Sequence, residues 1–408
     1  MNIAFIGCGF VFDIYMRTMR AHPELIVKGV FDINTARLES AKNFYGFHGY
    51  SSVEELLADP EVEIVVNLTN IASHFEVSKA ALEAGKHVYS EKPLTKNLEE
   101  SKLLYKTAGT YNVRLYAAPC NIFSDSIRTL FKAVEAGTIG TPLLVYAELD
   151  DNPIHLMEFE KVKSPRGTPW PLIEEIQEGC TYEHLGYHLV WICGLLGPAI
   201  SVVAYSNELI TDKTNKIPGK SGTPDYSVLN LHFETGASAR ITCSVVAPRD
   251  HRMRVIGYKG ELSTDSYRQY RAPVFLENYS KASLNARKFR IVRALPFLGR
   301  LIGVGGRKLP LVRNWKSHAV ERDQQSQTSL KQRAVEWLRR NQVYAQDKLL
   351  GVAEMAREIK SGEPQYLSPD FLLHINELTL LTQAAGPDGI ATKPTTTFKR
   401  LGEIPGTQ

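Results

Sequence analysis

Three features are missing from this sequence of 408 residues, and each absence excludes a class of protein. No two of its five cysteines stand in a C-x-x-C spacing, which argues against a disulfide framework and against a structural zinc site. The first ten residues carry no basic cluster before their apolar run, unlike a secretory signal peptide. Two glycines, a proline and a serine interrupt the longest apolar run, Leu189–Tyr205, so it falls short of a membrane-spanning helix. We therefore expect a reduced, cytoplasmic protein without a transmembrane segment.

A large excess of one charge is also missing overall, but one segment departs from this balance. Lys and Arg number 48 against 44 Asp and Glu, a net charge of +4. Residues 281–341 hold 15 basic and only 3 acidic residues, so this segment carries +12 and the rest of the chain −8. Its interleaved basic and apolar residues suit peripheral contact with an anionic membrane, a diphosphate, a polyanion, another subunit or the chain's own sheet. No nucleic-acid-binding module accompanies the charge, so we expect no nucleic-acid partner.

The apolar content of 43% is enough for a sizeable core, and the length allows two or three domains of ~100–200 residues. Over the first third, short apolar runs alternate with amphipathic stretches, which predicts βαβ units and a parallel sheet. The strands expected there are Asn2–Ile6, Ile26–Phe31, Ile64–Leu68 and His87–Ser90. The helices expected there span residues 13–21, 34–45, 53–58, 74–84 and 98–112.

The pattern changes after about Gly140, where strand-like runs follow one another with few helices between them. These runs span residues 143–150, 202–206, 227–233, 238–247 and 252–257. Helices are expected around residues 181–196, 349–360 and 372–385. The sequence thus predicts an α/β protein: an N-terminal parallel-sheet domain, an α+β domain with a mostly antiparallel sheet, and a tail. The expected boundaries are 1–122, 123–385 with the basic segment inserted at about 281–341, and 386–408.

A glycine turn follows the first expected strand. Gly7 would make the tight turn, and Gly9 would let a pyrophosphate approach the helix N-terminus, where Phe10 and Val11 would also meet the cofactor. The third position of the G-x-G-x-x-G pattern is Phe12 rather than a small residue, which predicts a displaced helix or a rotated pyrophosphate.

An acidic residue stands at the expected distance from this turn. Asp32 ends the second strand, 23 positions after Gly9, where a carboxylate binds the adenosine ribose 2′-OH and repels a 2′-phosphate. NAD is therefore the expected cofactor, although the nearby Arg37 leaves NADP open. The alternative is an ordinary glycine turn, with Asp32 capping the next helix.

Residues 80–94, AALEAGKHVYSEKPL, resemble the hallmark of the Gfo/Idh/MocA family of NAD(P)-dependent sugar and cyclitol oxidoreductases. The resemblance runs to about Ala385, except for the basic segment, and four further segments match in order: Gly29–Asp32, Thr69–Asn70 with His74, Ala136–Gly140 and Ile359–Pro364. It implies a Rossmann domain, then a domain with a large open-faced sheet that could pair subunits, so we expect a homo-oligomer. It also implies that Thr69, Asn70, His74 and Glu91 help to hold the cofactor.

The resemblance assigns a role to Lys92 of the E-K-P motif. In the family this lysine hydrogen-bonds the hydroxyl that is oxidised, and the bond before Pro93 tends to be cis. A buried ammonium suits that role, because it lowers the pKa of an alcohol and stabilises the developing alkoxide. The alternative is a solvated lysine before a turn.

Two histidines match the second catalytic segment of the family, D-x-G-x-H. His188 falls on the family's general acid/base, whereas His184 stands where the family more often has aspartate. Their i, i+4 spacing places both on one helix face. Because a histidine supplies no carboxylate, we expect Glu183 or Glu178 to replace it in part. A zinc-binding pair and a structural pair remain alternatives, but no third ligand is evident and we expect no metal.

Further residues are expected to choose the substrate. Arg166 suits a carboxylate or phosphate, and Trp170 suits the C–H-rich face of a sugar, although both could belong to an ordered surface loop. Three more substrate-binding residues are expected from their place beside the family's motifs: Asn121, Glu183 and Tyr187. Tyr187 could equally be a packing residue.

Together these residues predict an NAD(P)-dependent oxidoreductase that acts on a secondary alcohol or ketone of a sugar, nucleotide sugar or cyclitol. His188 would take the hydroxyl proton, with His184 beside it and Lys92 on the alkoxide. Two other functions stay open. One is an NAD-dependent glycosidase that oxidises its substrate transiently. The other is a non-catalytic dinucleotide sensor or scaffold.

Overall fold

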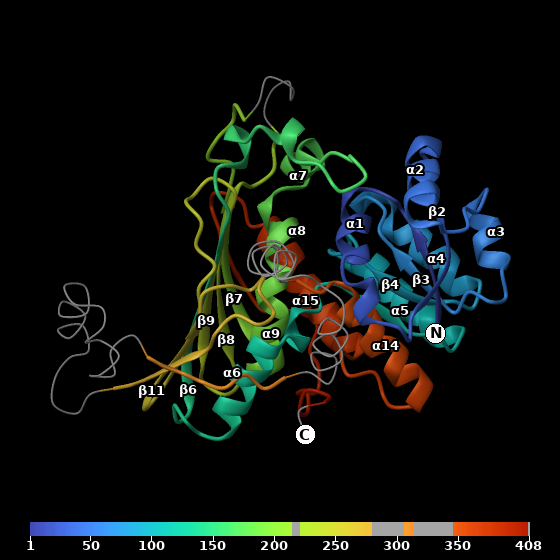
Figure 1. The fold of residues 1–408 in the computed structure, drawn as a ribbon. Coiled ribbons are helices and arrows are strands. Elements are labelled where there is room, and N and C mark those ends of the chain that lie inside the picture. Colours follow the sequence, from blue (N-terminus) through green and yellow to red (C-terminus); the bar gives the residue numbers. More distant parts are fainter. Residues whose placement is uncertain (214–220, 280–305, 314–345, 407–408) are drawn as a thin grey trace, which may run out of the picture.

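The computed structural model describes residues 1–213, 221–279, 306–313 and 346–406. Figure 1 shows two sheets, one on each side of the molecule, with the helices α8 (Cys180–His184), α9 (Gly186–Leu196) and α15 (Pro369–Gln383) between them. The predicted succession of a parallel-sheet domain and a mostly antiparallel one is confirmed.

The first domain is built on a five-stranded sheet in which every described pairing is parallel. Its strands, in the spatial order β2-β1-β3-β4-β5, are β1 (Asn2–Ile6), β2 (Ile26–Phe31), β3 (Ile64–Asn67), β4 (His87–Ser90) and β5 (Leu115–Ala117). Its helices are α1 (Phe10–Met16), η1 (Met19–Ala21), α2 (Thr35–Tyr45), α3 (Val53–Ala58), η2 (Ile71–Ser73), α4 (His74–Glu83) and α5 (Leu98–Thr110).

Local chemistry explains where these helices begin. The side chains of Asn34, Ser52 and Asn97 accept backbone N–H groups of the first turns of α2, α3 and α5. Every residue of β3 is buried, as expected for the centre of a parallel sheet covered on both faces. The order places β1 beside β3, so the chain reverses direction across the sheet between them, and the loops that follow these two strands meet.

The second domain is built on a nine-stranded sheet with the order β13-β12-β11-β10-β6-β9-β8-β7-β14. Among the described pairings only β6 with β9 is parallel. The strands are β6 (Pro142–Asp150), β7 (Ala199–Asn207), β8 (Tyr226–Phe233), β9 (Ser238–Ser244), β10 (Met253–Gly257), β11 (Gly260–Thr264), β12 (Phe275–Asn278), β13 (Arg307–Lys308) and β14 (Ile390–Thr392). Burial alternates along β8 and β9, so one face of the sheet packs against the helices and the other is open.

The remaining helices follow β5 in the chain. They are η3 (Asn121–Phe123), α6 (Asp125–Glu135), η4 (Ile154–Leu156), η5 (Phe159–Lys161), α7 (Leu172–Glu178), α8, α9, α14 (Leu349–Ser361) and α15. Glu358 of α14 accepts hydrogen bonds from Tyr116 (2.7 Å) and Arg114 (3.2 Å), which ties the late part of the chain to the first domain.

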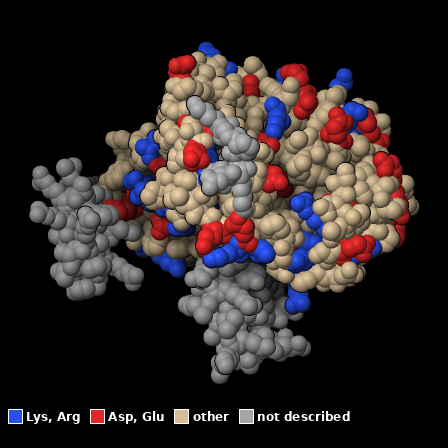
Figure 2. Space-filling view, turned by 90° about the horizontal axis from the view of Figure 1, so that it is seen from above, with Lys and Arg blue, Asp and Glu red and all other residues tan. Residues whose placement is uncertain are grey.

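The C-terminal residues return to the second domain. The strand β14 pairs with β7, and Phe398 is buried against Phe371 and His374. Only residues 306–313 of the basic segment at 281–341 belong to the described residues. The roles expected for this segment therefore lie outside the described part of the chain. No helix in the described ranges combines the length and the apolar character needed to cross a bilayer. Figure 2 shows acidic and basic side chains intermixed on the face seen from above.

Candidate active site

The glycine turn lies where the loops after β1 and β3 meet. Gly7 has φ +101°, and a Cβ there would lie 2.5 Å from the carbonyl oxygen of Leu68. Only glycine therefore permits this approach. A Cβ on Gly9 would meet nothing within 4 Å, so the backbone is open at the start of α1, beside the half-buried Phe10 and Val11. This openness suits the approach of a pyrophosphate.

Asp32 and Phe12 both support the turn. The Asp32 carboxylate accepts backbone hydrogen bonds from Cys8 (2.7 Å) and Asn34 (2.8 Å), which fixes the turn against the end of β2. Phe12 is fully buried and packs edge-on against Phe5, with ring centroids 5.2 Å apart. Phe12 thus fills the core beneath α1 instead of the turn, and the residues present fit a dinucleotide.

Arg166, expected at the substrate, lies against this turn instead. It belongs to the loop before α7, which in Figure 1 reaches across to α1. Its guanidinium forms an ion pair with Asp13 (2.7 Å) and donates to the carbonyl oxygens of Cys8 (2.7 Å) and Arg37 (3.3 Å). The side chains of Arg166 and Asp13 are fully buried, whereas Arg37 is exposed. The second domain therefore contacts the glycine turn of the first domain through this arginine.

The predicted cofactor residues after β3 hold the loops of the site through hydrogen bonds. Asn70 caps η2 by accepting the Ser73 N–H, and the Thr69 hydroxyl donates to Asn67 (2.7 Å). The buried His74 ring lies 2.8 Å from the carbonyl oxygen of Pro93 and 3.2 Å from that of Thr69. His74 thereby connects the loop after β3 to the E-K-P motif.

Glu91 is held by a lysine that the sequence argument did not single out. Lys348, just before α14, places its ammonium 2.6 Å from the Glu91 carboxylate, and the Tyr15 hydroxyl donates to the same oxygen (3.0 Å). Burial would raise the pKa of Glu91, but Lys348 and Lys92 outweigh it and lower the pKa to about 2. Glu91 is therefore an anion in the interior.

Lys92 points into the space between the domains. The Lys92–Pro93 bond is cis, and the ammonium forms an ion pair with Glu183 of α8. Burial would lower the pKa of Lys92, but the carboxylates of Glu183 and Glu91 outweigh it and raise the pKa above its ordinary value. Lys92 therefore stays a cation and a hydrogen-bond donor at neutral pH.

The two histidines share one face of the α8–α9 segment but lie at different depths. His188 is fully buried; its Nε2 donates to the carbonyl oxygen of Glu148 (3.0 Å), and its Nδ1 accepts from Trp191 (3.1 Å). His184 is buried but slightly more exposed, and its Nε2 lies 3.6 Å from the Asp151 carboxylate. Burial lowers the pKa values of both, to about 3 for His184 and about 4 for His188, so both are neutral at neutral pH.

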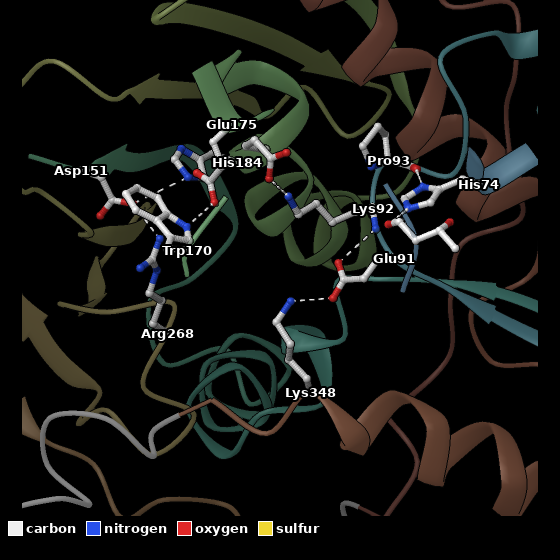
Figure 3. Close-up of polar contacts among 12 residues, drawn as sticks. His74, Glu91, Lys92, Pro93, Asp151, Trp170, Glu175, His184, Arg268 and Lys348 are labelled. Atoms are coloured by element: carbon white, nitrogen blue, oxygen red, sulfur yellow. Dashed lines mark hydrogen bonds and ion pairs between the residues drawn. The ribbon is translucent and has the colours of Figure 1, made fainter. Parts of the chain in front are cut away.

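A second group of polar residues surrounds Lys92 and His184. Figure 3 shows Trp170, Glu175, Asp151 and Arg268 gathered beside His184, with Lys92 pointing toward them. Trp170 donates its indole N–H to Glu175 (2.8 Å), and burial together with Glu183 raises the pKa of Glu175 to about 7. Asp151 accepts from Arg268 (2.6 Å) and lies 2.9 Å from His251.

Sequence reasoning missed Glu175, Asp151, Arg268, His251 and Lys348. Asp151 follows directly on an expected strand, so the run Asp150-Asp151 was a signal that could have indicated it. The other four stand in no local motif.

The remaining predicted substrate residues lie deeper. Asn121 is fully buried and donates to the carbonyl oxygen of Tyr187 (2.8 Å), so it supports α9 from η3. The Tyr187 ring packs against Tyr267, with centroids 4.9 Å apart. Within the described ranges, no three His, Cys, Asp or Glu side chains are arranged to hold a metal ion.

Comparisons with known proteins identify the family of the chain. Residues 1–118 match the model of the GFO_IDH_MocA oxidoreductase family with an NAD-binding Rossmann fold, and residues 127–263 match that of its C-terminal domain. Myo-inositol 2-dehydrogenase of Thermotoga maritima is 27% identical over 66% of this chain and 76% of its own.

Two solved structures share the fold. Levoglucosan dehydrogenase, solved with NADH and levoglucosan, gives a TM-score of 0.69 at 17% identity, covering 96% of this chain and 99% of that one. UDP-N-acetylglucosamine 3-dehydrogenase of Acidithiobacillus ferrooxidans gives a TM-score of 0.62 at 17% identity, covering 95% and 98%. The two family models together match more than half of the sequence, which confirms the expected family, fold and cofactor class. The chain belongs to the Gfo/Idh/MocA family of NAD(P)-dependent oxidoreductases.

Proposed function

We propose that the protein transfers a hydride between a bound NAD(P) and a secondary alcohol or ketone of a sugar, nucleotide sugar or cyclitol. The observation that carries this proposal is the cationic Lys92 between the two domains, held by Glu183 and facing His184. The names of the similar proteins, which act on inositol, levoglucosan and a nucleotide sugar, support this substrate class.

The roles of the residues follow from their chemistry. When bound, the dinucleotide supplies the hydride acceptor; Gly7, Gly9 and Asp32 would hold it, with Thr69, Asn70 and His74 shaping the adjoining loop. Lys92 would donate a hydrogen bond to the substrate hydroxyl and stabilise the alkoxide that forms as the proton leaves. A neutral histidine beside it would supply the base. Trp170 and Glu175 would face the hydroxyl-bearing part of the substrate.

The experiment is a comparison of Lys92→Ala with the wild type on myo-inositol, scyllo-inositol, levoglucosan and UDP-N-acetylglucosamine. We expect wild-type NAD(P)H formation with at least one of them, and a loss of turnover of about 10²-fold or more in Lys92→Ala with dinucleotide affinity retained. Lys96→Ala is the matched control, because Lys96 is more exposed and pairs with Glu178. Equal turnover in Lys92→Ala and wild type would overturn the proposal. Net NAD(P)H formation also separates this activity from a glycosidase, which would recycle its cofactor.

A further inference from the structure

The geometry points to His184, positioned by Asp151, as the group that takes the substrate proton, and to His188 as a structural residue. The inference rests on the proposed hydride transfer and reverses the assignment that the motif alone implies, where His188 is the base. It follows from the two hydrogen bonds that the His188 ring makes and from the place of the His184 ring beside the Asp151 carboxylate.

His188 has no nitrogen left for a substrate. Its Nε2 hydrogen is used on the carbonyl oxygen of Glu148, and its Nδ1 lone pair is used by the Trp191 indole N–H. The ring is fully buried and packs edge-on against Tyr267, with centroids 5.7 Å apart. To act as a base, His188 would have to break a buried hydrogen bond and leave the indole N–H unsatisfied, which is costly.

His184 has the opposite arrangement. Its Nε2 faces the Asp151 carboxylate at 3.6 Å, and its Nδ1 has no hydrogen-bond partner among the described residues, although the side chain is only 7% exposed. The charge of the Asp151 carboxylate, 3.6 Å away, favours the tautomer that carries its hydrogen on Nε2, which leaves the lone pair on Nδ1. An unsatisfied buried acceptor needs a donor, and a substrate hydroxyl held by Lys92 would supply one.

Asp151 is suited to hold the charge that the histidine acquires. Burial would raise its pKa, but His251, Arg268 and His184 hold the pKa below its ordinary value, so Asp151 stays ionised. His251 and Arg268 fix the carboxylate from the other side, at 2.9 Å and 2.6 Å. Asp151 would thus be a positioning residue that acts through His184.

The step balances without a further reactant. Oxidation breaks the O–H and C–H bonds of a secondary alcohol and forms a C=O bond. The proton would go to Nδ1 of His184, and a bound oxidised dinucleotide would accept the hydrogen on carbon with its electron pair. The product is a ketone beside an imidazolium that faces Asp151; reduction runs the same step backward.

The test compares His184→Ala with His188→Gln. We expect His184→Ala to lose 10²–10⁴-fold in kcat and to recover part of it with added imidazole, while dinucleotide affinity stays unchanged. Glutamine can replace both hydrogen bonds of His188, so His188→Gln should stay within about fivefold of wild-type kcat even if its Tm falls. Loss of kcat in His188→Gln, with activity retained in His184→Ala, would overturn the inference.

A second measurement needs no substrate and separates this inference from the proposed function. Nitrogen NMR of the histidine rings at pH 7, assigned with the two variants, reports the tautomer of each. We expect the Nε2–H form for His184, and a loss of that preference in Asp151→Asn. A His184 ring with its hydrogen on Nδ1 would overturn the inference whether or not the four substrates are turned over. A wild type that shows the expected tautomer but reduces no dinucleotide would overturn the proposed function alone.

Discussion

The ammonium of Lys92 and the carboxylate of Glu183 form an ion pair, although 91 positions separate them. Lys92 follows β4 of the first domain, and Glu183 lies on α8 of the second, so the pair joins the two domains at the site. The side chains are only 12% and 16% exposed, so water and salt screen the pair little. This ion pair is consistent with the sequence-based hypothesis that Glu183 or Glu178 replaces the usual aspartate in part, which stays a prediction.

Glu183→Gln should displace Lys92 and lower its pKa. Burial lowers the pKa of Lys92, and Glu183 is the largest of the charges that outweigh this effect. We expect kcat at neutral pH to fall roughly 10–100-fold, because the ammonium loses the group that positions it. The alkaline limb of kcat/KM should also move to lower pH. Glu174→Gln, an exposed position on α7, is the control; an unmoved alkaline limb in Glu183→Gln would contradict the account.

The two glycines of the turn should respond differently to alanine. A Cβ on Gly7 would clash with the carbonyl of Leu68, and the positive φ of this residue disfavours any side chain. Gly7→Ala should therefore lower Tm by several degrees. A Cβ on Gly9 meets nothing within 4 Å, so Gly9→Ala should keep the wild-type Tm. It should nevertheless weaken dinucleotide binding about tenfold or more, because the methyl group occupies the pyrophosphate's approach. Calorimetric titration checks this; unchanged affinity in Gly9→Ala would place the cofactor elsewhere.

Lys348→Met should leave the buried carboxylate of Glu91 without its ion-pair partner. Glu91 has a pKa of about 2 instead of 4.5, so its pairing stabilises the fold above pH 4.5 and is lost as pH falls toward 2. Removing Lys348 should cost about 3–5 kcal/mol of unfolding free energy at pH 7. The Tm difference from wild type should narrow as pH falls toward 4, where Glu91 can take up a proton. The double variant Glu91→Gln/Lys348→Met should recover much of the loss; no recovery would show that Lys348 stabilises through packing alone.

Glu175 should make stability depend on pH in the opposite sense. Its pKa is raised from 4.5 to about 7, so its contribution is fully present below pH 4.5 and is lost as pH rises through 7. This corresponds to roughly 3 kcal/mol of unfolding free energy. Glutamine still accepts the Trp170 hydrogen bond and cannot ionise, so Glu175→Gln should raise Tm at pH 8 but not at pH 5. The measurement is the Tm of Glu175→Gln and of the wild type at pH 5 and at pH 8, with Glu174→Gln as the control. An equal change in Tm at both pH values would be evidence against a raised pKa of Glu175.

Much of the first domain could be predicted from the sequence because its signals are local. The expected strands Ile26–Phe31 and His87–Ser90 have the bounds found in the structure. β5 has only three residues, too few to show a period. The helix α6 was missed although its apolar residues, at positions 127, 130, 131 and 134, recur at helical spacing.

The site was predicted only where a motif marks it. The motif identified Lys92 and both histidines. It could not tell which histidine has both ring nitrogens hydrogen-bonded, because those bonds are made with Glu148 of β6 and with Trp191. Arg166 was expected at the substrate and lies at the glycine turn, because its loop crosses to the first domain. Asp151, Arg268 and Lys348 reach the site through tertiary contacts between distant segments.

Transfer of deuterium tests the central claim most directly. Myo-inositol, scyllo-inositol and levoglucosan, each deuterated on carbon, are incubated with the wild-type protein and the oxidised dinucleotide, and the nicotinamide product is analysed by mass spectrometry. The account predicts a reduced dinucleotide that carries one deuterium from at least one of these substrates. A dinucleotide that stays oxidised with all of them, or is reduced without deuterium, would contradict it.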